Sequence, residues 1–260
     1  MIEQLQDILL ELGVKLLKWR SEGATEGEWQ GTQLKAEADV RSHDFVSAAL
    51  STAWPDIPIL SEEDLTSLTN DRPAEYWLID PIDGTASFCS GFDGFVTQAA
   101  LMRDAEPVLG MVHAPALGLT FAATKGGAAT CNGQSLVVGG RAAVNPVLID
   151  NYPEPHGIAR SLYLGLPCSA YVESGSLGLK ICRIADGTAD LFVKDVVVRD
   201  WDLAPAHLIL ECVGGTLTTL SGAQIPYAGV FERAGIIAAA NPQLAAHVHN
   251  WLNRHLPDAP

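Results

Sequence analysis

The chain has 260 residues, of which 16 are Lys or Arg and 31 are Asp or Glu, so its formal net charge is −15. An acidic chain of this kind repels phosphate backbones and anionic membrane surfaces, and no apolar run reaches the roughly 20 residues that span a bilayer. We therefore expect a cytoplasmic protein without nucleic-acid polymer or membrane partners. Its five cysteines are scattered and odd in number, which argues against both a disulfide framework and a zinc site.

The first segment of the chain, residues 2–19, has apolar residues at helical spacing and predicts an amphipathic helix. It lacks the basic start and the small-residue cleavage site of a signal peptide. Residues 21–33 are polar and contain glycine, so we expect a loop there. Helical periodicity returns over residues 36–50 and predicts a second helix.

Short apolar runs follow these helices. The runs at residues 57–60 and 76–79 are each followed at once by acidic residues, which predicts buried strands with carboxylates at their ends. Residues 96–124 alternate strand-like runs with turn signals. Asn132-Gly133 predicts a hairpin turn before a strand at residues 135–138. This part of the chain is expected to form an antiparallel sheet.

The second half of the sequence mixes strand and helix patterns. Strands are predicted at 147–150, 169–172, 189–193 and 236–240, and helices over 177–186, 201–212 and 242–255. We therefore expect an α/β fold with layered α+β character, made of two sandwich subdomains of alternating helix and mixed-sheet layers. The boundary is placed so that the subdomains are residues 1–143 and 144–260.

Acidic residues gather where two predicted strands end. Asp80 and Asp83 stand three residues apart across an expected turn, and the pair Glu62 and Glu63 follows the preceding strand. Unpaired carboxylates crowded together repel one another, so such a cluster usually binds a hard cation that prefers oxygen ligands. Magnesium fits this donor set better than zinc, and the free carbonyl of Ile82 could add a further oxygen.

Gly84 and Thr85, the two residues that follow Asp83, suggest a place for a phosphate group. Gly84 permits a tight bend, and Thr85 can open the next helix, so that backbone N–H groups point towards an anion. Asp-Pro and Asp-Gly alone are ordinary turn dipeptides, and Thr85 alone could simply cap a helix. The combination of acids after both strands is what favours a functional site.

These motifs resemble those of the inositol monophosphatase family of metal-dependent phosphatases, which also includes 3'(2'),5'-bisphosphate nucleotidases. The first motif is residues 77–85 (WLIDPIDGT) and the second is residues 201–206 (WDLAPA). The upstream acidic element is residues 61–63, the hairpin is residues 125–133, and Asn241-Pro242 follows the last strand. The resemblance covers most of the chain and implies an inositol-phosphatase-like fold in which the C-terminal subdomain supplies Asp202.

By position, the resemblance implies that two or three Mg²⁺ ions are held by carboxylates and one carbonyl. The implied metal ligands are Glu62, Asp80, the carbonyl of Ile82, Asp83 and Asp202. Glu62 also counts among the catalytic residues, together with Thr85 and an early-helix aspartate that help to activate the attacking water. We place that aspartate at Asp39, because its spacing to the helix that follows favours this position. Glu37 and Asp44 are the alternatives, since the Val-Thr pair that precedes the aspartate in the family is absent here.

The reaction implied is hydrolysis of a phosphate monoester by metal-activated water, without a covalent enzyme intermediate. Substrate contacts are expected from Gly84, Thr85 and Asp202, and from two residues of the second half. Asp195 lies shortly before the second motif, where inositol phosphatases hold sugar hydroxyls, although Lys194 competes for that place. Ser176 lies in a segment that is similar to the nucleotide-proximal part of bisphosphate nucleotidases.

The expected partner is thus a small phosphorylated metabolite, and a homodimer is an option because family members are often dimers. Inositol monophosphate is slightly favoured as substrate. The alternatives are a nucleotidase acting on 3'-phosphoadenosine 5'-phosphate and a non-catalytic protein that binds Mg²⁺ or a phosphorylated metabolite. A phosphatase with a nucleophilic aspartate is disfavoured, because it needs Asp-x-Asp and this chain has Asp-x-x-Asp.

Overall fold

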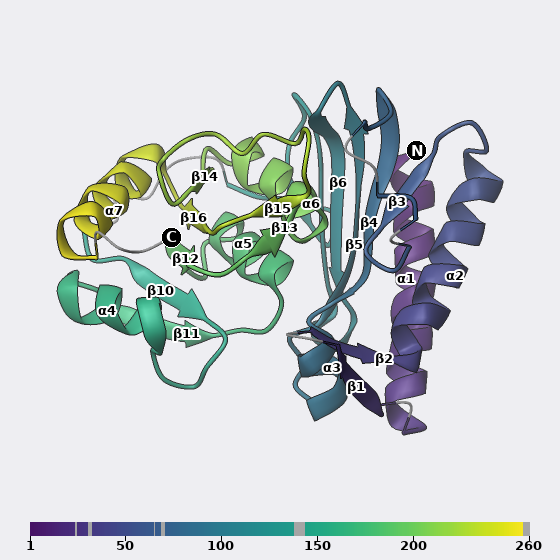
Figure 1. Ribbon diagram of the computed structural model, residues 1–260, viewed down its shortest axis with the longest axis horizontal. Helices are drawn as coiled ribbons and strands as arrows, with labels where there is room; N and C mark the ends of the chain where they lie inside the picture. The colour runs from purple at the N-terminus through teal and green to yellow at the C-terminus, as the bar shows by residue number, and fades with distance from the viewer. Residues whose placement is uncertain (24, 31–32, 65, 69–70, 138–143, 257–260) are drawn as a thin grey trace.

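Helices and sheets alternate in five layers in the computed structural model of this chain (Figure 1). It describes residues 1–260 except 24, 31–32, 65, 69–70, 138–143 and 257–260, and the side chains of 28–36 are also left undescribed. Two helices cover the outer face of a seven-stranded sheet, two lie between the sheets, and two cover the far face of a five-stranded sheet. In this order, the helices are α1 (Ile2–Ser21), α2 (Glu37–Ala53), α5 (Leu177–Ala185), α6 (Asp200–Cys212), α4 (Gly157–Gly165) and α7 (Pro242–His255).

The seven-stranded sheet is built from the first half of the chain. In spatial order its strands are β3 (Ile59–Ser61), β4 (Glu75–Asp83), β5 (Val96–Arg103), β6 (Glu106–Ala114), β7 (Leu119–Thr124), β8 (Thr130–Cys131) and β9 (Gln134–Ser135). β3 and β4 are parallel and the other pairs are antiparallel. β4 is buried along nearly its whole length because helices cover both faces of the sheet. This burial explains the continuous apolar run at residues 76–79.

The second half of the chain forms the five-stranded sheet. Its strands in spatial order are β11 (Ala170–Glu173), β10 (Val147–Asp150), β12 (Leu191–Lys194), β16 (Ile236–Ala239) and β14 (Thr216–Thr219). β10 is parallel to both of its neighbours, whereas β16 is antiparallel to both of its own. Shorter elements are the pair β1 (Gly27–Gln30) and β2 (Gln33–Ala36), helix α3 (Thr85–Ser90), the 3₁₀ turn η1 (Pro115–Leu117), and the pair β13 (Val198–Arg199) and β15 (Glu232–Arg233).

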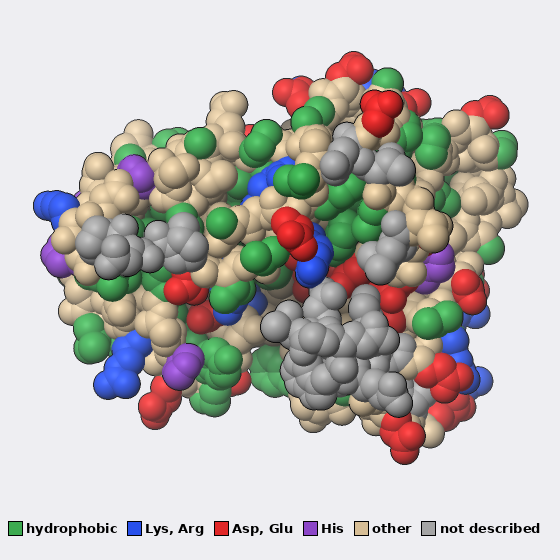
Figure 2. Space-filling model, viewed as in Figure 1, with side chains coloured by type: hydrophobic (Ala, Val, Ile, Leu, Met, Phe, Trp, Pro, Cys, Tyr) green, Lys and Arg blue, Asp and Glu red, His purple; other side chains and the backbone are tan. Residues whose placement is uncertain are grey.

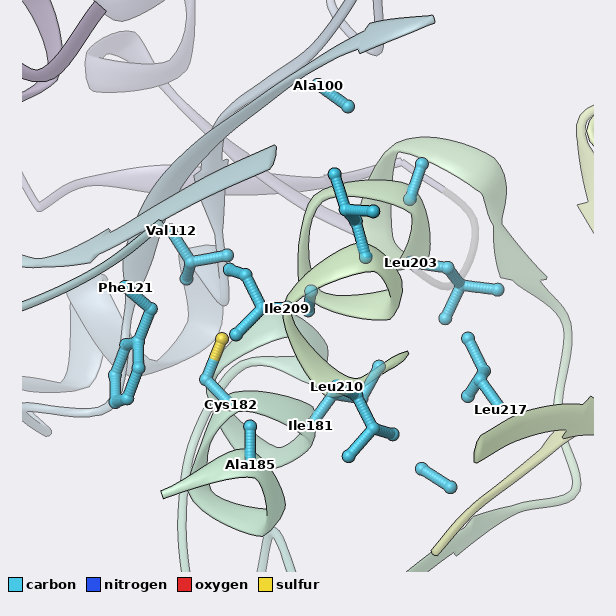
Figure 3. Packing of buried hydrophobic residues seen from close by; sticks show 14 of the residues in the cluster. Ala100, Val112, Phe121, Ile181, Cys182, Ala185, Leu203, Ile209, Leu210 and Leu217 are labelled. Atoms are coloured by element: carbon cyan, nitrogen blue, oxygen red, sulfur yellow. The ribbon is translucent and has the colours of Figure 1, made fainter. Parts of the chain in front are cut away.

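The layer between the sheets packs tightly. Figure 3 shows side chains of α5 and α6, among them Cys182 and Ile209, lying against Val112 and Phe121 of the seven-stranded sheet. α6 approaches this sheet so closely that a Cβ at Gly110 would lie 2.4 Å from a backbone carbonyl of the helix. This close packing holds the middle of α6 against β6.

The layered α/β fold expected from the sequence is confirmed. The expected loop at 21–33 is wrong in part, because β1 and the start of β2 lie in it. The strand expected at 135–138 is shorter, since β9 ends at Ser135, and residue 138 lies outside the described part. The proposed subdomain boundary at 143/144 also adjoins undescribed residues and stays a prediction, although the two sheets fall on either side of it.

Two further expectations concern the cysteines and membrane-spanning helices. All five cysteines are free thiols, and only Cys182 is fully buried. Within the described ranges, no helix combines the length and the apolar content needed to cross a bilayer.

Candidate active site

Three carboxylates from separate elements converge between the two sheets. Glu62 directly follows β3, Asp80 lies in β4, and Asp202 is the third residue of α6. Each offers an oxygen, and these oxygens lie within 4.8 Å of one another. The parallel register of β3 and β4, which pairs Ser61 with Ile79, places the first two acids side by side. Figure 2 shows acidic side chains near the middle of the face in view, between the part that carries β3 and β4 and the part that carries β13.

Asp83 joins this cluster through a β-bulge. The expectation that Asp80 and Asp83 lie across a turn is wrong, because β4 continues to Asp83. Its pairing with β5 shifts between Asp80, opposite Gln98, and Asp83, opposite Val96. Residues three apart in a regular strand point to opposite faces, and one extra residue brings them to the same face. The bulge therefore explains how both acids reach one cluster.

The carboxylate of Asp83 is held by three donors. It accepts hydrogen bonds from the backbone N–H of Gly178 at 2.8 Å and of Leu177 at 3.4 Å, both in the first turn of α5. The side-chain amide of Gln98 donates at 3.2 Å. A carboxylate at a helix N-terminus is stabilised by the helix dipole and the free N–H groups. Asp83 thereby links the β4 segment to the start of α5.

Asp202 is oriented by its own helix. The backbone N–H of Arg199, the N-cap residue of α6, donates to Oδ2 of Asp202 at 2.7 Å. This contact is the return half of a capping box, in which the third helical residue accepts from the N-cap backbone. A carboxylate oxygen of Asp202 lies within 4.8 Å of oxygens of Glu62 and Asp80.

The electrostatics of the cluster favour a cation. Burial raises the pKa of Asp80 well above its usual range, and the charges of Glu62, Asp83 and Asp202 raise it further. Burial, followed by the charges of Asp83 and Glu62, likewise raises the pKa of Asp202. Burial raises the pKa of Asp83 to about 6 despite its hydrogen bonds. Oδ2 of Asp80 is buried and has no hydrogen-bond partner among the described residues. Crowded carboxylate oxygens with an unused acceptor fit Mg²⁺, which is bound almost entirely by oxygen.

Next to the cluster, Thr85 contacts an aspartate of α2. Its hydroxyl lies 3.1 Å from Oδ1 of Asp39. Asp39 is buried, with 2% of its surface exposed, whereas Glu37 and Asp44 are exposed. Of the three acids considered from the sequence, the structure therefore brings only Asp39 to Thr85. The catalytic role of this pair stays a prediction.

Ile82 and Gly84, which precede Thr85, shape the turn in front of it. The N–H of Ile82 donates to Oδ1 of Asp80 at 3.1 Å, and its carbonyl oxygen lies 3.3 Å from the hydroxyl of Thr85. Gly84 has φ 89°, a left-handed conformation, and a Cβ there would lie 3.2 Å from the Cβ of Ser176. Glycine is therefore required both for the turn and for the close approach of α5.

The surroundings of the candidate substrate residues in the second half of the chain do not test their expected roles. Ser176 is buried, with 3% of its surface exposed. Its hydroxyl oxygen accepts a hydrogen bond from the N–H of Leu179 at 3.0 Å, so Ser176 caps the N-terminus of α5. Asp195 follows β12 and is half-buried. Lys194 pairs with Asp150 at 3.7 Å. The substrate contacts of Ser176 and Asp195 stay predictions.

The sequence reasoning missed a buried cation beside this site. Lys180 is 1% exposed, its ammonium donates to the carbonyl of Gly175 and to the side chain of Asn151, and it lies 4.9 Å from the ring centre of Phe192. Burial lowers its pKa to about 7, against the charges of Asp150 and Asp83. The available signal was a lysine in the middle of a largely apolar helix. Lys180 stabilises the loop that starts α5 and so supports the donors to Asp83.

The raised pKa values predict an unusual pH dependence of the metal-free protein. A carboxyl whose pKa is higher in the folded state contributes stability below the unfolded pKa, and this contribution is lost as pH rises through the folded pKa. With the pKa of Asp83 near 6, and those of Asp80 and Asp202 also raised, the loss begins near pH 4 and continues past pH 6. Lys180, with a pKa near 7, stays protonated over most of this window.

We therefore expect the protein in chelator to melt at least about 5 °C higher at pH 5 than at pH 7. Differential scanning calorimetry at both pH values measures this difference, and saturating Mg²⁺ should abolish or reverse it. A melting temperature in chelator that rises from pH 5 to pH 7 would contradict the raised pKa values of the clustered carboxyls.

Sequence comparison finds two groups of relatives. The model described as the inositol monophosphatase family matches residues 4–256. A protein of Aggregatibacter actinomycetemcomitans named 3'(2'),5'-bisphosphate nucleotidase CysQ is 31% identical over an alignment of 211 residues that covers 74% of each chain. The SuhB protein of Neisseria meningitidis is 28% identical over an alignment of 229 residues that covers 85% of each chain.

Solved structures share the fold. The suhB protein of Bartonella henselae aligns with a TM-score of 0.84 at 22% identity and covers 98% of both chains. An IMPase of Thermotoga maritima aligns with a TM-score of 0.81 at 24% identity, covering 95% of this chain and 96% of that one. At this identity the likeness establishes the layered architecture alone.

Proposed function

The chain belongs to the inositol monophosphatase family and is a metal-dependent phosphatase, and from this premise we propose that it hydrolyses 3'(2'),5'-bisphosphate nucleotides such as 3'-phosphoadenosine 5'-phosphate. The carboxylate cluster of Glu62, Asp80 and Asp202 is the observation that carries the chemistry. The substrate class is supported by relatives named as bisphosphate nucleotidases at about 30% identity. Small phosphorylated metabolites are the substrates of this family.

Inositol monophosphate, which the sequence slightly favoured, is the second candidate. Asp195 supports it, because a half-buried acid after β12 could accept hydrogen bonds from polyol hydroxyls. A Staphylococcus aureus relative by fold has a structure with inositol monophosphate bound and another with 2'AMP bound. A fold of this kind therefore accommodates both a polyol phosphate and a nucleotide, and the choice rests on the chain's own side chains.

The proposed cation ligands are oxygens already brought together. Glu62, Asp80 and Asp202 would hold one Mg²⁺, and the carbonyl of Ile82 with the carboxylate of Asp83 would complete the set for two or three ions. When bound, Mg²⁺ supplies the positive charge that neutralises the phosphate dianion, lowers the pKa of a coordinated water and stabilises the leaving oxygen. The metals also explain how a chain of net charge −15 can bind an anion.

The chain's own residues would do the rest. Thr85 donates its hydroxyl proton to Asp39, so its oxygen lone pairs are free to accept a hydrogen bond from the attacking water. Asp39, buried beside it, holds that hydroxyl in place and can take up the proton. Gly84, in a left-handed conformation, and Thr85 would present backbone N–H groups to the phosphate. Ser176 and Asp195 would face the rest of the substrate.

The test compares the two substrates side by side. Phosphate release at saturating Mg²⁺, with and without chelator, gives kcat/KM for 3'-phosphoadenosine 5'-phosphate and for inositol 1-phosphate. We expect a chelator-sensitive preference for the nucleotide of at least about tenfold, which is the lower end of the discrimination that pocket contacts provide. A preference for inositol 1-phosphate would make the second candidate the function. Release from neither substrate would refute both and favour a non-catalytic binder or another phosphate ester.

A further inference from the structure

A buried group of three charges lies next to the carboxylate cluster. Asp200 is fully buried, and its Oδ2 accepts from Nη2 of Arg72 at 2.7 Å and from Nη2 of Arg233 at 3.0 Å. The side chains of the two arginines are 5% and 7% exposed. Charges are removed from water only at a high free-energy cost, which good geometry and further hydrogen bonds must offset. Such a group calls for a functional explanation.

Arg72 connects two separate parts of the chain. It lies between β3 and β4, after Glu62 and before Asp80, yet its guanidinium donates to carbonyls that precede β15. Nε and Nη2 contact the carbonyl of Gly229 at 3.2 and 3.0 Å, and Nη2 contacts that of Val230 at 3.0 Å. The same guanidinium lies 3.7 Å from the ring centre of Phe231. Its planar fork thus contacts a carboxylate, two carbonyls and an aromatic ring at once.

Asp200, which pairs with Arg72, begins the helix that carries Asp202. Asp200 is the first residue of α6 and Asp202 the third. The backbone N–H of Asp200 donates to the carbonyl of Phe231 at 3.0 Å, so the whole first turn is tied to the Arg72 contacts. A displacement of this turn would move Asp202 away from Glu62 and Asp80, which lie on the same β3–β4 segment of the chain as Arg72.

We propose that Arg72 is a positioning residue for the cation site: by pairing with Asp200 and binding the carbonyls before β15, it sets the distance between Asp202 and the acids of β3 and β4. The inference rests on the proposed function for the identity of the cation. Arg233 serves as an internal comparison, because it pairs with the same carboxylate oxygen from β15, on the α6 side, and makes no link to the β3 and β4 segment in the contacts described.

The experiment measures Mg²⁺ binding without substrate. Isothermal titration calorimetry gives Kd for the wild-type protein, Arg72→Gln and Arg233→Gln, at a temperature well below the melting point of each. Loss of a residue that orients a metal ligand weakens binding about 10-fold to 100-fold, and we expect this for Arg72→Gln. Arg233→Gln should lose less affinity, even if it lowers the melting temperature as much.

Three results separate the possible failures. An unchanged Kd in Arg72→Gln, or an equal loss in both variants, would overturn the positioning role. If Arg72→Gln does not fold, Arg72→Lys provides the test, because it keeps the charge but loses the fork that contacts Asp200 and the carbonyls together. Its Kd should exceed that of the wild type, and an unchanged value would also overturn the role. A wild-type protein that binds no Mg²⁺ would instead refute the proposed function.

Discussion

Asp80→Asn is expected to lower magnesium-dependent phosphate release at least about a hundredfold, because removing a ligand costs more than the 10-fold to 100-fold loss seen for residues that only orient one. The same change should raise the melting temperature of the metal-free protein. Burial raises the pKa of Asp80, and the neighbouring charges of Glu62, Asp83 and Asp202 raise it further. Replacing its charge by an amide of the same shape relieves repulsion and leaves the packing of β4 intact.

The two readouts are informative because they move in opposite directions. Phosphate release at a range of Mg²⁺ concentrations gives the activity, and calorimetry in chelator at pH 7 gives the stability. Glu75→Gln is the matched control, since Glu75 begins the same strand but forms an exposed pair with Arg103. Exposed pairs contribute little, so both readouts should stay near wild type. Full activity in Asp80→Asn, or a lower melting temperature without metal, would contradict the assignment of Asp80 as a ligand.

Sequence periodicity predicted α1 and β4 because the burial of each follows one pattern along its length. α1 buries one apolar stripe, and β4 is covered on both faces, so each carries a strong local pattern. The antiparallel pair of β1 and β2 was missed because its strands are mostly polar and only four residues long. Short elements such as these are defined by their pairing partners, which local patterns do not reveal.

The candidate site divides in the same way. Glu62, Asp80 and Asp83 could be proposed together because the ends of adjacent strands meet at one edge of a sheet. The bulge that turns Asp83 towards Asp80 could not be predicted, because it depends on the register with β5. Contacts such as Arg72 with Asp200 join residues far apart in sequence, and a lone arginine in a loop gives no local signal of its buried partner.

Thr85→Ala is expected to lower kcat about 10²-fold to 10⁴-fold, the usual contribution of a positioned acid-base group, while Kd for Mg²⁺ stays near wild type. The hydroxyl of Thr85 contacts Asp39 and the carbonyl of Ile82, not a carboxylate of the cluster. Its loss therefore removes the path from the attacking water to Asp39 and leaves Glu62 and Asp80 as they are. Single-turnover rates and Mg²⁺ titration calorimetry measure the two quantities separately.

Thr85→Ser is the matched control, because serine keeps the hydroxyl within reach of Asp39 and should retain most of the rate. Asp39→Asn should resemble Thr85→Ala, and the double variant should lose little more than either single change. Residues that act as one unit give such non-additive losses, whereas independent contributions would multiply. Unchanged turnover in Thr85→Ala, or losses that multiply in the double variant, would mean that Thr85 and Asp39 do not pass a proton between them.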